Sequence, residues 1–237
     1  MNTTTINVTK RDGSIKPFDL DKVHKVLEWA VEDISGVSMS EIELKANIQL
    51  YDKIAAYDIH ELLIKSAAEL ISEHTPNYQF VAARLISYKM RKEAYGEYTP
   101  PPLTAIIEDN IELGVYDDEI IKIYSEDEIV ELDAYIKHDR DDTFTYAGME
   151  QFRGKYLVQN RATGIVYETP QVAYMMIALT LFGNYPKEER MHWVKDFYNS
   201  ISNFDISLPT PIMACLLYTS DAADDSLRVD LGGRRII

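Results

Sequence analysis

The sequence contains one cysteine in 237 residues, which excludes a disulfide within the chain. This scarcity fits a reducing compartment, and we expect a cytoplasmic protein. The sequence also lacks any run of about 18 apolar residues, the length that a membrane-spanning helix needs. Its first residues have neither the basic block nor the apolar block of a secretory signal. We therefore expect no association with a membrane.

Positive charge is scarce as well, because 24 Lys and Arg face 39 Asp and Glu, leaving a formal net charge of -15. Affinity for nucleic acid comes largely from neutralised phosphates, so we expect no nucleic-acid partner. A small polyphosphate needs only a few local cations and is not excluded. The sequence has no Gly-rich phosphate loop, no zinc-ligand spacing and no nucleophile elbow. We expect no metal in this chain.

What is present is the composition of a globular protein, with 46% hydrophobic residues and a mean hydropathy of -0.22. The length allows one or two domains with a sizeable core. The run Thr99-Pro100-Pro101-Pro102 is the clearest linker, because consecutive prolines end regular structure. It divides the chain into an N-terminal and a C-terminal part.

Apolar periodicity predicts a mainly α-helical N-terminal part behind a short β-hairpin. The hairpin turns at Asp12-Gly13, a pair that favours tight turns because glycine adopts positive φ without strain. Four helices are expected to follow, over residues 20–36, 40–50, 58–71 and 76–96. Ser40, in a capping box, and Asp58 are the expected N-caps of the second and third helices.

The C-terminal part is expected to be helical with one further hairpin. Helices are predicted over residues 103–113, 125–135, 144–152, 170–182 and 186–201, and the hairpin strands over 156–158 and 165–167. A Ser125/Glu128 capping box begins the second helix. The charged stretch from His138 to Asp142 is interpreted as a solvated turn rather than a metal site. The stripe of Met175, Met176, Leu179 and Phe182 is interpreted as core.

The first hairpin concentrates cations at its turn. Lys10 and Arg11 immediately precede Asp12-Gly13, and Lys22 lies on the first turn of the next helix. A lysine at a helix N-terminus opposes the helix dipole, whereas a bound anion would relieve this conflict. Two interpretations are therefore open on local grounds, a solvated turn and a polyphosphate site.

Three sequence blocks in a fixed order carry a family resemblance. They are this hairpin, Asp58-Ile59-His60-Glu61 and Arg91-Lys92-Glu93-Ala94-Tyr95-Gly96. Together they resemble the ATP-cone, the nucleotide-sensing module of many ribonucleotide reductase large subunits. The resemblance implies a helical bundle capped by a small β-hairpin sheet over residues 1–96, and it implies ATP or dATP as an allosteric effector.

The resemblance also implies which residues bind the nucleotide. Matched residue by residue, they are Lys10, Arg11, Lys16, Pro17, Phe18, Asp19, Lys22, His60 and Lys92. Lys92 has support from spacing, since it continues a helical stripe after Tyr88 at one end of the bundle; a snorkelling lysine is the alternative. For His60 the alternative is an ordinary surface residue. Ala56 replaces a polar residue often found in the family, a departure that concerns ribose or base recognition.

Residues 97–213 resemble the start of the helical N-terminal domain of class I ribonucleoside-diphosphate reductase large subunits, most clearly at Tyr156–Arg161 and Ser207–Pro211. This implies an oxidoreductase that reduces ribonucleoside diphosphates to deoxyribonucleotides for DNA synthesis. A separate small subunit would generate the radical, and large subunits would associate with one another. Thr210 matches a substrate-contacting threonine, with a rigid turn as the alternative. The family's catalytic residues lie beyond this part, so we expect the chain alone to be inactive.

The resemblance ends after Met213, and we interpret residues 214–237 as a non-family tail from a truncated reading frame; a natural C-terminus is the alternative. Three other identities stay open. A stand-alone ATP-cone nucleotide sensor would carry a zinc-binding cysteine cluster, whereas this chain has only Cys215. An anaerobic-type reductase is disfavoured by residues 97–213. A helical interaction module without a ligand is the third.

Overall fold

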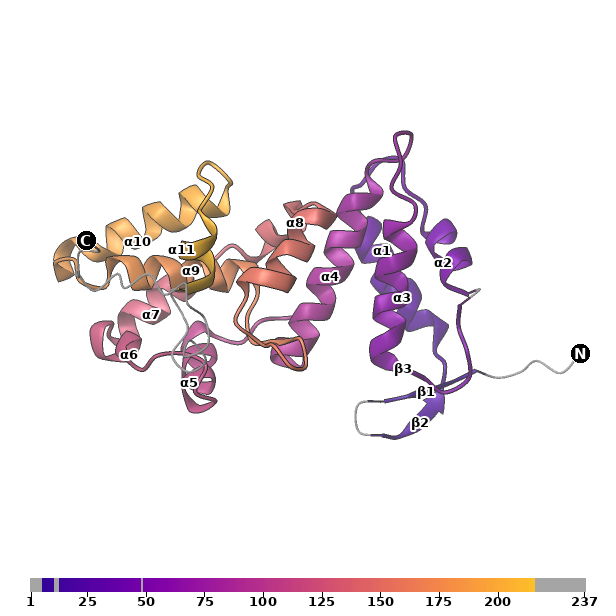
Figure 1. The fold of residues 1–237 in the computed structure, drawn as a ribbon, viewed down its shortest axis with the longest axis horizontal. Helices are drawn as coiled ribbons and strands as arrows, with labels where there is room; N and C mark the ends of the chain where they lie inside the picture. The colour runs from indigo at the N-terminus through magenta and orange to yellow at the C-terminus, as the bar shows by residue number, and fades with distance from the viewer. Residues whose placement is uncertain (1–5, 11–12, 48, 216–237) are drawn as a thin grey trace, which may run out of the picture. The chain divides into compact units, whose positions relative to one another are not determined.

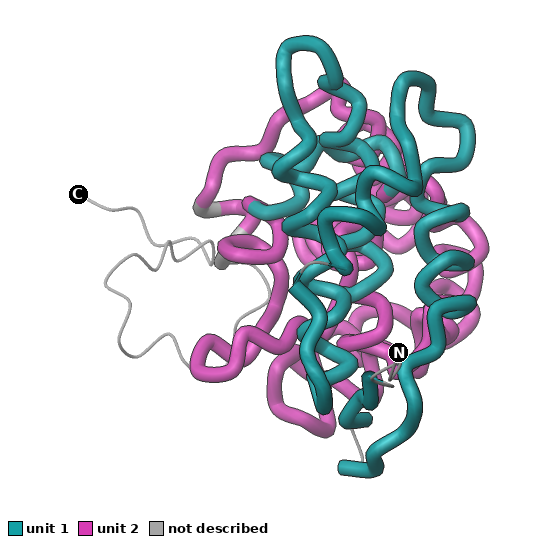
Figure 2. The backbone as a smooth tube through the Cα atoms, turned by 90° about the vertical axis from the view of Figure 1, so that its right-hand side faces the viewer, with its two compact units in different colours: residues 1–89, 142–150 teal, residues 90–141, 151–237 magenta. Residues whose placement is uncertain are grey.

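The computed structural model describes residues 6–10, 13–47 and 49–215. The chain is mainly α-helical with two small sheets, as predicted (Figure 1). It divides into two compact units, one comprising residues up to 89 with 142–150, and the other 90–141 with the residues from 151 onward (Figure 2). The division falls inside helix α4, whereas the sequence places the domain boundary at that helix's end. The domain limits therefore stay a prediction.

The first unit contains a three-stranded sheet in the order β2-β1-β3. The strands are β1 (Asn7–Thr9), β2 (Ile15–Pro17) and β3 (Ile54–Ala55). β1 and β2 form the predicted antiparallel hairpin, and Gly13 has the positive φ of 78° that its turn needs. β3, which pairs parallel to β1, was not predicted because two residues are too few to show alternation.

Helices build the rest of the first unit (Figure 1). They are α1 (Leu20–Val31), α2 (Met39–Asn47), α3 (Ala56–Ala68), the N-terminal part of α4 (Tyr78–Tyr95) and α8 (Tyr146–Gln151). Their apolar faces meet in a core in which Leu27, Ile42, Leu63 and Ile86 are all at most 2% exposed. Burial of such side chains is the main favourable term in folding.

The predicted N-caps of α2 and α3 are wrong. α2 begins at Met39, one residue before the predicted cap Ser40. At this helix start the Ser38 backbone N–H donates to the hydroxyl of Tyr78 at 2.9 Å, so the polar contact comes from a side chain of α4. α3 begins directly after β3 with Ala55 as its N-cap, which places Asp58 inside the first turn. There the carboxylate still complements the helix dipole.

The second unit follows the predicted order of elements closely. Its elements are the C-terminal end of α4, α5 (Leu103–Glu112), α6 (Glu119–Ile123), α7 (Glu126–Asp133), a π-helix (Phe152–Tyr156), β4 (Gln159–Asn160), β5 (Ile165–Val166), α9 (Pro170–Phe182), α10 (Lys187–Ser202) and α11 (Thr210–Cys215). The Ser125/Glu128 capping box is confirmed. A hairpin forms in the predicted region, but the prediction of its first strand over 156–158 is wrong, because the π-helix runs to Tyr156 and the strand is β4. α6, the π-helix and α11 were not predicted. α9 is buried along most of its length, which confirms Met175, Met176 and Leu179 as core, whereas Phe182 at its end is half-buried.

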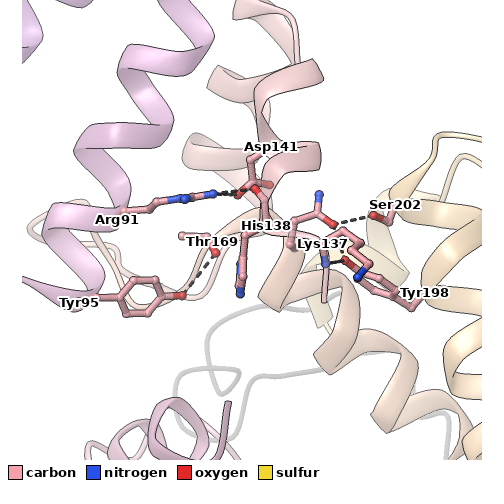
Figure 3. Close-up of polar contacts among 9 residues, drawn as sticks. Arg91, Tyr95, Lys137, His138, Asp141, Thr169, Tyr198 and Ser202 are labelled. Atoms are coloured by element: carbon pink, nitrogen blue, oxygen red, sulfur yellow. Dashed lines mark hydrogen bonds and ion pairs between the residues drawn. The ribbon is translucent and has the colours of Figure 1, made fainter. Parts of the chain in front are cut away.

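The prediction of a solvated turn at His138–Asp142 is wrong. These residues belong to a 3₁₀ helix, and the side chain of Asp141 is fully buried. Arg91 of α4 donates from Nη2 to the backbone carbonyl of His138 at 2.7 Å and pairs with Asp141 Oδ2 at 3.4 Å (Figure 3). Burial, and secondarily the Arg91 charge, lowers the pKa of the His138 imidazole to about 4. The stretch is a buried anchor for α4.

No helix within the described part of the chain combines the length and the apolar content that crossing a bilayer requires.

Candidate nucleotide-binding site

The hairpin positions two of the predicted nucleotide-binding lysines. The Lys10 N–H donates to the Ser14 carbonyl at 2.8 Å, and the Gly13 N–H donates back to the Lys10 carbonyl at 2.9 Å, which closes the turn. Lys10 is half-buried, whereas Lys16 and Pro17 are exposed on the edge strand β2. Proline is tolerated there because an edge strand need not donate to a neighbour. Arg11 lies outside the described residues.

The chain then enters α1 through two further predicted residues. The Phe18 N–H donates to the Ile6 carbonyl at 2.9 Å, which extends the hairpin contact, and Phe18 is half-buried. Asp19 is the N-cap residue of α1, and its carboxylate pairs with Lys22 Nζ at 3.1 Å. This hydrogen bond lowers the pKa of the Asp19 carboxyl. Asp19 therefore supplies Lys22 with an anionic partner at the N-terminus of α1 even when no ligand is bound. The side chains of Asp19 and Lys22 are both exposed.

The N-terminus of α3 lies beside the same hairpin. Thr9 of β1 pairs with Ala55 of β3, and the Thr9 hydroxyl donates to the Lys53 carbonyl at 3.0 Å. The Lys53 N–H in turn donates to the Asn7 carbonyl at 2.9 Å. α3 begins at Ala56, directly after Ala55 of β3. Its first turns, which carry His60, are therefore fixed relative to β1.

His60 belongs to an aromatic group formed by three helices. Its imidazole is half-buried and lies with its centroid 5.4 Å from that of Tyr88 on α4. Tyr88 lies 5.9 Å from Trp29 on α1, again centroid to centroid. Such flat faces can stack on a base or on one another.

An apolar recess lies between α1, α2 and α3. It encloses only about 10 Å³, which is roughly the room that one water molecule needs. Its lining includes Phe18, Leu20, Val23, Ala46, Leu50, Ile59 and Leu62. A nucleotide does not fit into a recess of this volume.

The predicted site residues fall into two groups. Those described in the first unit gather around the sheet and the starts of α1 and α3, and they are Lys10, Lys16, Pro17, Phe18, Asp19, Lys22 and His60. Lys92 is half-buried in the last turn of α4, in the second unit. Thr210 begins α11 there, with its hydroxyl 3.4 Å from that of Tyr156. The roles of Lys92 and Thr210 stay predictions.

Sequence analysis missed a buried cation beside His60. Lys89 on α4 is 3% exposed, forms an ion pair with Glu61 and lies with Nζ 3.7 Å from the ring centroid of Tyr57. Its position between Tyr88 and Met90, inside a largely apolar helix segment, was the available indication. A lysine at such a site requires a partner, because an unpaired buried charge is costly.

Comparison with known proteins finds two matching family models. Residues 6–93 match the sequence model described as "ATP cone domain", and residues 142–217 match "Ribonucleotide reductase, all-alpha domain". The alpha subunit of ribonucleoside-diphosphate reductase 1 from Escherichia coli is 51% identical over 207 residues, which is 87% of this chain. The corresponding subunits of Haemophilus influenzae and Enterobacteria phage T4 are each 44% identical, over 94% and 88% of this chain.

The sheet-capped helical unit and these matches define a class, an ATP-cone combined with the all-alpha region of ribonucleotide reductases. The chain belongs to the family of class I ribonucleoside-diphosphate reductase alpha subunits. It spans 27%, 31% and 28% of the length of the three relatives named, respectively, so most of the sequence of those proteins has no counterpart here.

Proposed function

We propose that the first unit binds ATP or dATP as an allosteric effector, and that the chain is the nucleotide-sensing part of a ribonucleoside-diphosphate reductase large subunit. The observation that carries the proposal is the pairing of β3 on β1, which places the start of α3 beside the hairpin turn. Lys10 at the turn and the start of α3 thereby lie side by side, and the start of α1, which carries Lys22, follows β2 of the same sheet in an otherwise acidic chain. Helix N-termini and nearby cations together favour phosphate.

In this proposal the phosphates contact Lys10 and Arg11 at the turn and Lys22 at the start of α1. An incoming phosphate would share Lys22 with Asp19, because the two side chains already pair. The backbone from Lys16 to Asp19 contacts the nucleoside, and His60 lies near it on α3. Lys92 contributes a further basic contact.

The same proposal covers the whole protein. It reduces ribonucleoside diphosphates to deoxyribonucleotides in the cytoplasm, with a radical supplied by a small subunit, and its large subunits associate with one another. Thr210 contacts the substrate. ATP favours the active assembly and dATP the inhibited one, which amounts to a coupling free energy between distant sites. The isolated chain is inactive, because the catalytic part lies beyond it.

Calorimetric titration of the 237-residue chain with ATP and with dATP tests the proposal. We expect binding to both nucleotides, and Lys10→Ala combined with Arg11→Ala should weaken it about tenfold or more, because hydrogen bonds to charged groups are strong. Lys25→Ala combined with Lys65→Ala is the matched control, since it removes the same charge from exposed positions of the same unit. Absence of binding heat at millimolar nucleotide would refute the proposed function.

A further inference from the structure

The buried cation Lys89 needs an explanation of its own. Its ammonium group is almost fully removed from water, being 3% exposed, and its ion-pair partner Glu61 retains 37% of its side-chain exposure. The ring of Tyr57 covers the ammonium at 3.7 Å. A buried ion pair of this kind contributes little net stability, because desolvation offsets the attraction, but its geometry is specific.

The contacts of Lys89 with Glu61 and Tyr57 join α4 to the N-terminal half of α3. Tyr57 and Glu61 are four residues apart and therefore share one face of α3, and Lys89 lies against both. One residue along each helix, His60 lies against Tyr88. Two consecutive residues of α3 thus meet two consecutive residues of α4, which fixes how far α3 can slide or rotate.

The opposite end of α3 also has an ion pair, but this one is exposed to water. There Glu69, the residue after the helix, pairs with Lys45 of α2 at 3.0 Å, and both side chains are at least 37% exposed. Exposed pairs of this type constrain structure weakly. Of these two ion pairs, the one at Lys89, whose ammonium is shielded from water, is therefore the stronger constraint on α3, in addition to the pairing of β3 with β1.

We propose that Lys89, together with Glu61 and Tyr57, is a positioning residue for the nucleotide site of the first unit. It holds the first two turns of α3, which carry His60, in place beside the hairpin. This inference depends on the proposed function of that unit.

Lys89→Met is the primary test, measured by ATP titration of the full chain. Methionine has a similar length and suits a buried position, and Glu61 is left where water reaches it, so the fold should tolerate the change. We expect the Kd for ATP to rise about tenfold, as is typical when a supporting contact behind a ligand site is removed. Lys89→Arg, which keeps the charge and the ring contact, should restore most of the affinity.

Two further variants separate positioning from general stability. Glu69→Gln, the matched control, removes the exposed ion pair at the far end of α3 and should leave the Kd for ATP unchanged. Adding Glu61→Gln to Lys89→Met should cause no further loss, because both changes remove the same contact. Additive losses would overturn the inference.

A final pair of outcomes keeps the inference distinct from the proposed function. If the wild-type chain binds ATP and Lys89→Met binds within twofold of it, the positioning role is wrong and the proposed function stands. If the wild-type chain binds neither ATP nor dATP, the proposed function itself fails. Should Lys89→Met not fold, Tyr57→Leu at a 45% exposed position provides the same test, with about threefold weaker binding expected and unchanged binding contradicting the inference.

Discussion

The carboxylate of Glu168 accepts a hydrogen bond from the hydroxyl of Tyr116 inside the second unit. A second hydrogen bond comes from the backbone N–H of Val158 at 2.8 Å. Glu168 is fully buried, and burial raises the pKa of its carboxyl to about 7 even though both hydrogen bonds act in the opposite direction. Burial thus brings the titration of this carboxyl toward neutral pH.

This carboxyl should make the stability of the second unit depend on pH. Because its pKa rises from 4.5 to about 7 on folding, its stabilising contribution is complete below pH 4.5 and disappears as the pH rises through 7. The loss amounts to about 3 kcal/mol at most. Urea unfolding of wild type and Glu168→Gln across this range should show the two free energies of unfolding diverging with pH. Parallel curves would contradict the assignment.

His138 should act with the opposite sign. Its pKa falls from 6.5 to about 4 on folding, so its contribution is present above pH 6.5 and is lost as the pH falls through 4. Partial exposure of the imidazole limits the effect to about 2 kcal/mol. His138→Gln should flatten the acid limb of the unfolding free energy and leave the neutral limb unchanged. An acid limb as steep as that of wild type would show that other groups control it.

Arg91→Met should destabilise the second unit strongly. The substitution removes a charged donor from the buried Asp141 carboxylate and from the His138 carbonyl, and losing hydrogen bonds of this kind costs about 1–3 kcal/mol each. Lys122→Met is the control, because the pair of Lys122 with Asp118 is exposed and worth about 1 kcal/mol or less. Urea unfolding followed by far-UV circular dichroism measures both. Equal losses in the two variants would rule out the anchoring role of Arg91.

Tyr78→Phe should weaken the junction of α2 and α4. The Tyr78 hydroxyl donates to Glu41 Oε2 at 2.6 Å and accepts from the Ser38 N–H at 2.9 Å. Removing the hydroxyl leaves the Glu41 carboxylate and the Ser38 N–H partly buried and without this hydrogen bond, which lowers the free energy of unfolding by about 1–3 kcal/mol. Tyr185→Phe, at an exposed position, should change the unfolding midpoint little. A midpoint for Tyr78→Phe that matches the control would show that the cap contact contributes nothing.

Elements with local determinants were predictable from the sequence. Pro170 at the first position of α9, the Ser125/Glu128 box of α7 and the Asp12-Gly13 pair of the hairpin each specify an element within a few residues. The structure has α9, α7 and the β1-β2 hairpin where they were expected. The family resemblance made the ATP-cone as a whole predictable.

What escaped prediction depends on partners distant in sequence. Asp141 looked solvated because Arg91 lies 50 residues earlier, and Lys89 gave no hint that Glu61, 28 residues away, was its partner. The starts of α2 and α3 shifted for the same reason, through Tyr78 and through strand β3. Local propensity yields to tertiary contacts at such positions.

The location of the nucleotide site is the central claim, and amide hydrogen exchange measured with and without ATP or dATP tests it most directly. Exchange protection reports ordering of the backbone, segment by segment. The account predicts added protection at residues 6–22 and 54–61, and no change across the β4-β5 hairpin. Nucleotide-dependent protection confined to residues 103–202, or none anywhere at saturating nucleotide, would contradict it.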